Sequence, residues 1–468
     1  MKHNPTAFLS NAREALQDRQ LQQALTRARA GFIGKRAKAV AAMPEFAQLR
    51  ERAAAVKADA LNRLPELLRQ YEQAVLASGG QVHWAETAEQ AKEIVVQLCR
   101  QSDGSNIAKG KSMVGEEAAL NPALEAAGFQ VLETDLGEYI IQLAKEPPSH
   151  IIAPAVHKTR EQVADLFAEH HTDLPEKTES IPGLVAEARR KLRQGFLDAD
   201  IGLTGANLLI ADTGTSVLVT NEGNGDLCST LPKTHIVIAG IEKVVPDLQA
   251  ATDILRVLGR SATGQAVTAY TSFFTGPKRA EDPDGPEQYH VVLVDNGRSG
   301  ISRGPYRDML RCIRCGACLN HCPIYAGVGG HAYGSVYPGP MGSVLTPLLN
   351  GLEESRELPN ACSLCGRCGE VCPVKIPLPD LLRRLREDQH QQGLTRLRWA
   401  MKLWAWAARR PWVWRFGTRI GSRLLRWSAR GKGRLRTVPF GTGWTAARDL
   451  PVPNQAPFLD QWKRGIRP

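Results

Sequence analysis

The chain has 468 residues, of which 43% are hydrophobic and 23% charged, enough apolar material for two or three globular domains. Its formal charge of +11 is uneven, because residues 381–468 hold 20 Lys and Arg against 4 Asp and Glu, which leaves residues 1–380 at −5. No apolar run reaches the roughly 18 residues of a spanning helix, and the first residues lack the apolar core of a secretory signal. We therefore expect a cytoplasmic protein, with peripheral attachment to the inner membrane face as the alternative.

Residues 1–78 predict a helical N-terminal segment, because Leu, Ala, Ile and Val recur there at three- and four-residue spacing. Between residues 79 and 298, short apolar runs alternate with helical stretches, which predicts an α/β domain with a mostly parallel sheet. The alternating segments are QVHWAE, AEQAKEIVVQLCRQ, KSMVGEE, NPALEAAGF, QVLETD, LGEYIIQLAK and HIIAPAVH, followed by ANLLIADTGTSVLVTNEG, HIVIAGIEKVVP and YHVVLVDNG. The polar segment GPKRAEDPDGPEQ is predicted as a loop before the last strand.

Eight of the ten cysteines fall in two blocks that follow the same pattern, C-x2-C-x2-C-x3-C-P. In that pattern three thiolates bind one [4Fe–4S] cubane, and the fourth binds the other cubane. The spacing predicts one cluster on Cys312, Cys315, Cys318 and Cys372, and a second on Cys362, Cys365, Cys368 and Cys322. Structural zinc is the alternative, but its sites are usually built from paired C-x2-C knuckles. Since every iron would have a protein ligand, we expect electron relay rather than substrate binding at the clusters.

The other two cysteines, Cys99 and Cys228, have no partner at metal-binding spacing and are predicted to be structural thiols, with Cys228 in a turn. The segment GSNIAKGKS resembles a phosphate-binding loop but has five residues between its glycines instead of four, and IAKGKSM is predicted to be a strand. Lys109 and Lys111 in this segment could still mark a neighbouring pocket. No G-x-G-x-x-G occurs, so the sequence gives no support for a nicotinamide or flavin site.

Four polar residues lie where strands of the predicted sheet end: Asp212, Glu222, Asn224 and His235. Open α/β sheets keep their binding sites at strand ends, which favours a site for the group. Each residue alone is also explained by ordinary turn chemistry, so the catalytic residues stay unassigned.

The basic region 396–468 interleaves Trp with Arg, as in LWAWAARRPWVWRF. We expect first that its rings pack on the cysteine region, second that it docks on a partner or a membrane surface, and last that it binds nucleic acid.

The chain resembles the iron–sulfur lactate utilization protein B family. The resemblance rests on both cysteine blocks and on ETDLGEYIIQLAKEPPSHIIAPAVH, GLTGANLLIADTGTSVLVTNEGNGDLCSTLPKTHIVIAGIEKVVP and GGHAYGSVYPGPMG. It implies a lactate-utilization domain of the NagB/RpiA/CoA-transferase-like α/β type at 79–298. An α-helical dicluster ferredoxin module would follow at 299–395, and a basic C-terminal extension at 396–468.

The same resemblance implies one of three proteins that together oxidise L-lactate to pyruvate. The partners would be a cysteine-rich, heterodisulfide-reductase-like subunit and a small protein with only the lactate-utilization domain. We therefore expect an oxidoreductase subunit rather than a self-sufficient enzyme, because cubanes accept single electrons and cannot accept a hydride. A redox-sensing or scaffold protein with a metabolite-binding α/β domain is the alternative, as is the same role for another 2-hydroxy acid such as glycolate.

Overall fold

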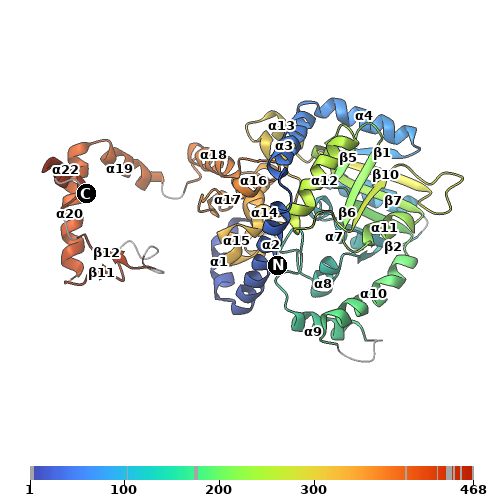
Figure 1. Cartoon of the computed structure of the whole chain (residues 1–468), viewed down its shortest axis with the longest axis horizontal. Helices are drawn as coiled ribbons and strands as arrows, with labels where there is room; N and C mark the ends of the chain where they lie inside the picture. The colour runs from blue at the N-terminus through green and yellow to red at the C-terminus, as the bar shows by residue number, and fades with distance from the viewer. Residues whose placement is uncertain are drawn as a thin grey trace. The chain divides into compact units, whose positions relative to one another are not determined.

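The computed structural model describes residues 5–102, 104–172, 178–395, 398–429, 431–438, 445, 448–453 and 456–465 (Figure 1). The chain divides into two compact units, Met1–Gln389 and His390–Pro468. The first unit contains N-terminal helices, an α/β domain and a cysteine module, and the second contains the basic extension. The boundaries at residues 78, 298 and 395 stay predictions.

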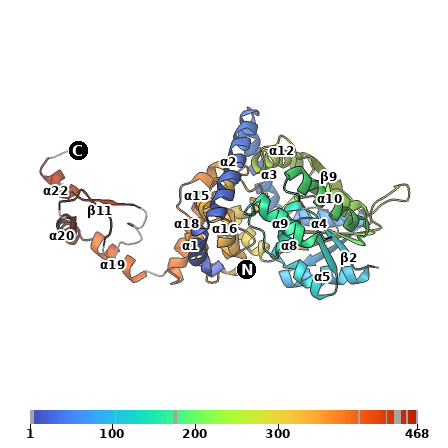
Figure 2. The same ribbon diagram turned by 90° about the horizontal axis from the view of Figure 1, so that it is seen from below.

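Four α-helices form the N-terminal segment: α1 (Phe8–Gln17), α2 (Arg19–Ala41), α3 (Phe46–Asn62) and α4 (Leu64–Ala77). The carboxylate of Asp18 accepts a hydrogen bond from Leu21 N at 2.9 Å and thereby caps the first turn of α2. Helices α1 and α2 pack on the cysteine module, whereas α2 and α3 contact α12 (Leu248–Ala262) of the α/β domain (Figures 1 and 2). The N-terminal helices therefore join the α/β domain to the cysteine module.

A six-stranded parallel sheet forms the centre of the α/β domain, in the order β1-β10-β7-β4-β2-β3. Its strands are β1 (Gln81–Ala85), β2 (Asn106–Lys109), β3 (Gln130–Glu133), β4 (Ile201–Gly205), β7 (Thr234–Gly240) and β10 (Gln288–Val294). Alternate residues of β10 point to opposite faces. Val291 and Leu293 share a core with Tyr71 of α4, whereas Val292 and Val294 share one with α5 (Ala88–Gln101). The mostly parallel α/β fold is confirmed.

The α/β domain also contains a second sheet of four strands, in the order β8-β5-β6-β9. Its strands are β5 (Leu208–Ile210), β6 (Thr215–Thr220), β8 (Val244–Val245) and β9 (Tyr270–Phe274). The antiparallel pair β5 and β6 is the pair of β-rich runs predicted around the Gly/Thr turn. The remaining helices of the domain are α6 (Met113–Glu117), α7 (Leu120–Ala126), α8 (Leu136–Ala144), α9 (Arg160–His170), α10 (Ile181–Leu197), α11 (Asn224–Thr230) and the 3-10 turn η2 (Ile241–Lys243).

Three local predictions were wrong. The run HIIAPAVH is a loop rather than a strand, and IAKGKSM is a strand only as far as Lys109, because Ser112 caps α6. Cys228 lies in α11 rather than in a turn. The sequence reasoning also did not identify β4 and β9 as strands. In β4, a Cβ on Gly202 would lie 1.7 Å from the Cys228 carbonyl oxygen, so this strand has a glycine where α11 approaches.

The cysteine module is built only from helices and loops among its described residues. Its elements are α13 (Arg298–Arg303), η3 (Arg307–Arg311), α14 (Ala317–Asn320), α15 (Pro323–Val328), η4 (His331–Tyr333), α16 (Gly339–Asn350), η5 (Leu358–Asn360), α17 (Arg367–Val371) and α18 (Leu378–Gln391). One continuous apolar core joins this module to Phe8 and Leu25 of the N-terminal helices and to Ile254 of α12.

The second unit contains α19 (Arg398–Ala408), α20 (Pro411–Ala429), α22 (Phe458–Lys463) and the short antiparallel pair β11 (Arg434–Leu435) and β12 (Leu450–Pro451). Arg419 of α20 binds both carboxylate oxygens of Asp460 at 2.6 Å, which connects α20 to α22. The Trp rings of α19 and α20 are exposed. Among the described residues, none of the helices is long and apolar enough to cross a bilayer.

Candidate functional site

The first cysteine block folds as a tight loop followed by α14. Arg314 and Gly316, which flank Cys315, both have positive φ, 59° and 71°. A side chain at Gly316 would also be crowded, because a Cβ there would lie 3.2 Å from Ile152. The loop is thereby held against residues 150–152 of the α/β domain.

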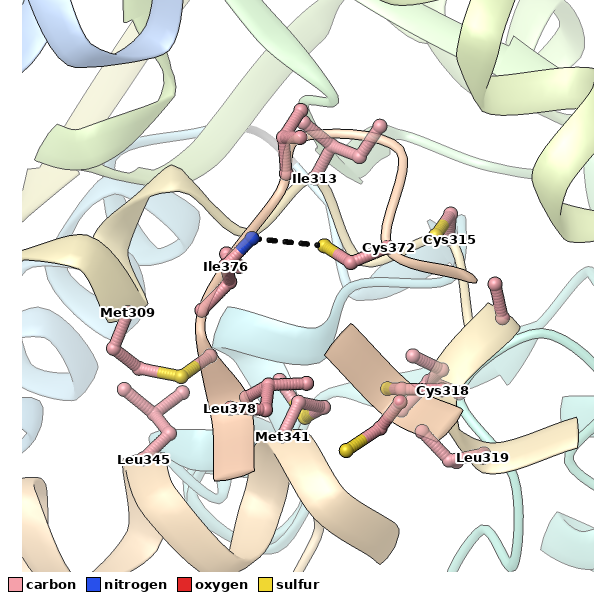
Figure 3. Close-up of a cluster of buried hydrophobic side chains, with 14 of the residues drawn as sticks. Met309, Ile313, Cys315, Cys318, Leu319, Met341, Leu345, Cys372, Ile376 and Leu378 are labelled. Carbon is pink, nitrogen blue, oxygen red and sulfur yellow. Dashed lines mark hydrogen bonds between the residues drawn. The ribbon is translucent and has the colours of Figure 1, made fainter. Parts of the chain in front are cut away.

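The structure brings together the thiols of each predicted ligand set. One small cavity is lined by Cys312, Cys315, Cys318 and Cys372, together with apolar side chains. Figure 3 shows three of these cysteines, Cys315, Cys318 and Cys372, among apolar side chains such as Met341 and Leu378. A second cavity is lined by the other set, Cys322, Cys362, Cys365 and Cys368. In both cavities the fourth cysteine comes from the opposite block, and α14 contacts α17 between them.

The surroundings of the eight thiols fit iron–sulfur clusters. Burial raises the pKa of Cys318 and Cys315, so their thiolates need a compensating cation. Backbone amides point at two of the sulfurs, Leu364 N to Cys362 Sγ at 3.2 Å and Ile376 N to Cys372 Sγ at 3.4 Å. Such hydrogen bonds to sulfur are among the features that tune cluster potentials.

The two cysteine sites differ in their exposure. In the first loop, Arg314 is buried against the α/β domain. Leu364 occupies the same position in the second loop with φ 55°, but it is 41% exposed, and Cys365 beside it is exposed as well. The first site therefore faces the interior of the unit, and the second lies at its surface.

Arg314 belongs to a buried charge network. Its guanidinium lies 3.4 Å from Glu242 and 4.7 Å from the centre of the Tyr337 ring. Arg298 contacts Glu242 at 2.8 Å and Glu117 at 2.7 Å, and Tyr337 donates a hydrogen bond to Glu117 at 2.6 Å. Burial alone would raise the pKa of Glu242, but the charges of Arg298 and Arg314 lower it to about 2. The network thus connects the first cysteine loop to the α/β domain.

A larger cavity of about 250 Å³ lies at the carboxyl ends of β2, β4 and β7, where open parallel sheets bind ligands. The predicted residues Glu222 and Asn224 line it, as does Lys111. The cationic residues Lys243 and Arg314 also line it and were missed by the sequence reasoning. Lys243 follows the end of β7, so the strand-end rule that selected Asn224 applies to it as well.

Three other predicted residues lie away from this cavity. His235 sits near the start of β7, is fully buried and shares a 2.8 Å hydrogen bond with Thr204 Oγ1. Asp212 is an exposed turn residue between β5 and β6. Lys109 is buried in an ion pair with Glu133 at 2.5 Å. The hypothesis of one site for the four strand-end residues is therefore wrong for His235 and Asp212.

Cys99 and Cys228 are both buried, as expected for structural thiols. Burial raises the pKa of each thiol to about 12. Neither lines a cavity of the other cysteines.

Three family descriptions match successive parts of the chain: the LUD domain at residues 68–294, the 4Fe-4S dicluster domain at 308–376, and the C-terminal region of lactate utilisation protein B at 383–465. An "uncharacterized electron transport protein" of Escherichia coli K12 is 41% identical over 469 residues, covering 99% of this chain and 98% of that protein. Lactate utilization protein B of Bacillus subtilis 168 is 41% identical over 474 residues, covering 98% and 96%. The same-named protein of Bacillus pumilus is 41% identical over 469 residues, covering 99% and 98%.

One solved structure also matches, a DUF162 family protein from Deinococcus radiodurans. It is 16% identical and covers 49% of this chain and 98% of its own, with a TM-score of 0.27.

Proposed function

Because this chain belongs to the lactate utilization protein B family, we propose that it relays electrons through two [4Fe–4S] clusters in a complex that oxidises L-lactate to pyruvate. The family supports an iron–sulfur role in lactate utilization. The observation that carries the relay is the pair of neighbouring cavities, each lined by four thiols.

The ligand sets in this proposal are those of the two cavities. Cys312, Cys315, Cys318 and Cys372 hold the first cluster. Cys362, Cys365, Cys368 and Cys322 hold the second. Four thiolates per cubane leave no iron open to substrate, and such clusters supply one-electron transfer.

Two clusters suit the stoichiometry of the reaction. Oxidation of L-lactate breaks the carbinol C–H and O–H bonds, forms the C=O bond of pyruvate, and releases two electrons and two protons. Each cubane accepts one electron, so the pair can hold both. Since cubanes do not accept a hydride, another cofactor or another subunit supplies the first acceptor.

The unequal exposure of the two sites supports a direction for the relay. The first site faces the interior, beside Arg314, and the second has the exposed residues Leu364 and Cys365. We propose that electrons enter at the first cluster and leave from the second. The proposed partners are a cysteine-rich, heterodisulfide-reductase-like subunit and a small lactate-utilization-domain protein. Peripheral membrane contact through the basic extension is part of the same proposal.

The test is anaerobic purification of the chain with its neighbouring gene products, followed by L-lactate-dependent reduction of an artificial acceptor. The ligand count predicts about eight irons per chain and cubane EPR signals after reduction. Stoichiometric zinc would refute the cluster assignment. Full iron without any lactate-dependent reduction would favour the redox-sensing or scaffold role instead, and reduction by glycolate but not by L-lactate would reassign the substrate.

A further inference from the structure

The cavity at the sheet edge and the first cysteine site share a wall. Ile151 lines both spaces, and Ile152 lines the cavity and contacts the cysteine loop at Gly316. Arg314 lies in the loop between Cys312 and Cys315 and also lines the cavity. A molecule in the cavity would therefore lie next to the first cysteine site.

The cavity is large enough for a small organic molecule, since a single water needs only about 10–15 Å³ of such space and the cavity measures about 250 Å³. Part of its lining is apolar, including Leu218, Val219 and Leu258. A lining of apolar side chains with a few polar groups is typical of small-molecule sites.

Lys243 provides an unpaired cation in this lining. It is only 6% exposed, yet it forms no hydrogen bond or ion pair with any residue in the part of the chain that the structure describes. Its neighbour Lys57 is 1% exposed, but it donates a hydrogen bond to the Glu242 carbonyl oxygen and does not line the cavity. The charge of Glu242 compensates the Lys243 cation only in part, against burial and the like charge of Arg314, and a bound anion would add to that compensation.

Asn224, which also lines the cavity, has an acceptor without a donor. Asn224 is 5% exposed; its Nδ2 donates to Thr134 Oγ1 at 3.4 Å, whereas its Oδ1 has no partner. A hydroxyl group on the ligand would satisfy Oδ1. The acidic residues Asp135 and Glu222 also line the cavity, and Lys111, which lies 3.3 Å from Glu138, is the third cation.

From these observations we propose that the cavity binds a small hydroxylated monocarboxylate. Its carboxylate contacts Lys243 and Arg314, and its hydroxyl donates to Asn224 Oδ1. Binding of the anion does not depend on the proposed electron relay. Only the coupling between anion binding and reduction of the first cluster rests on the proposed function. A carboxylate there neutralises cationic charge beside Cys312. Reduction adds negative charge at the same place, so the reduced protein binds the anion more weakly than the oxidised protein.

The test is calorimetric titration of the full-length, iron-loaded chain alone, before and after electrochemical reduction. We expect L-lactate to bind the oxidised protein and the neutral L-lactamide to bind at least about tenfold more weakly, since a charged hydrogen bond is lost. Propionate, which lacks the hydroxyl, should bind about five- to tenfold more weakly. A tenfold loss of affinity on reduction would correspond to a potential shift of about 59 mV for one electron.

Two matched variants distinguish the effect of Lys243, which lines the cavity, from that of its buried neighbour Lys57. Lys243→Met should weaken L-lactate binding about tenfold or more, whereas Lys57→Met should leave it near the wild-type value. Asn224→Ala should remove the preference for L-lactate over propionate and serves as a second test if Lys243→Met loses iron. Each variant is compared at equal iron content.

Absence of L-lactate binding by the fully loaded wild-type chain would overturn the proposal, as would equal binding by Lys243→Met and wild type. Tighter binding of inorganic phosphate than of L-lactate would also overturn it. These measurements use neither partner proteins nor turnover. Loss of lactate-dependent reduction in the complex, with binding intact, would therefore refute the relay but not the site.

Discussion

Replacing Arg298 by Met is expected to destabilise the first unit by about 3–5 kcal/mol at pH 7.5, the usual cost of breaking a buried ion pair from one side. The Arg298 side chain is 0% exposed and is the main cationic partner of two buried carboxylates. Its two terminal nitrogens bind both oxygens of Glu117 at 2.8 and 2.7 Å, and its Nε lies 2.8 Å from Glu242. The substitution leaves Glu242 with Arg314 at 3.4 Å as its cationic contact.

The loss of stability caused by Arg298→Met should depend on pH. Burial by itself raises the pKa of Glu117, and Arg298 holds that pKa below its ordinary value. In the wild type, this contribution is present above the unfolded pKa of about 4.3 and is lost as pH falls further. In the variant, burial without the arginine raises the folded pKa above the unfolded one, so protonation stabilises the folded state as pH falls. The difference between variant and wild type should therefore be smaller at pH 5 than at pH 7.5.

The assay is urea unfolding of the iron-loaded chain under anaerobic conditions, followed by visible absorbance of the clusters and by far-UV circular dichroism. Arg63→Met is the matched control, because Arg63 forms ion pairs with Asp59 and Glu66 on an exposed helix surface. Exposed pairs of this kind contribute about 0–1 kcal/mol. If Arg298→Met costs no more than Arg63→Met at pH 7.5, or costs more at pH 5, the reasoning about the buried network is refuted.

Three further predictions concern the ligands, the packing of the cysteine module and acid stability. Cys372→Ser should perturb the EPR signal of the cluster held by the first block and Cys322→Ser that of the second; the opposite assignment would refute crossed ligation. Gly330→Ala should lower folded yield and iron content, because the new Cβ would lie 1.7 Å from a backbone carbonyl oxygen of the α/β domain. Gly366 has φ 83°, but a Cβ there would meet no atom within 4 Å. Gly366→Ala should therefore lower the free energy of unfolding in urea by only about 1–2 kcal/mol. Burial lowers the pKa of His235 to about 3, so the unfolded state binds the extra proton between about pH 6.5 and pH 3. Stability should fall as pH drops through this window, by at most about 1.4 kcal/mol per pH unit for this residue, and His235→Gln should flatten the dependence of the urea midpoint on pH.

The secondary structure was predictable wherever the apolar period was long or the run was fully apolar. The helical N-terminal segment and strands such as β7 and β10 are of this kind. Prediction failed where a segment is apolar because it packs on another part of the chain. The loop 150–157 is an example: His150 bonds Asn320 of the cysteine module at 3.0 Å, and the Ser149 carbonyl oxygen just before it accepts a hydrogen bond from Tyr325 at 2.8 Å.

The candidate site was predictable only in part, for a similar reason. Strand ends indicated Asn224 and Glu222 correctly as cavity residues, but the same rule could not tell them from Asp212. Which strand ends meet depends on the order of strands in the sheet, and β2, β4 and β7 are neighbours although they are far apart in the sequence. That order is set by long-range packing, which has no local signal.

The sequence by itself predicted the eight cysteine ligands and their division into two sets, because cluster motifs have short, fixed spacings along the chain. The structure groups the thiols in the same way around two cavities. The tertiary structure alone decided that the first set lies against the α/β domain and the second at the surface. It also decided that Lys243, unpaired, and Arg314 from the cysteine loop line one cavity. These facts depend on contacts between segments separated by many residues. Such contacts are stable only when apolar surface is buried and the buried charges are paired in the same fold.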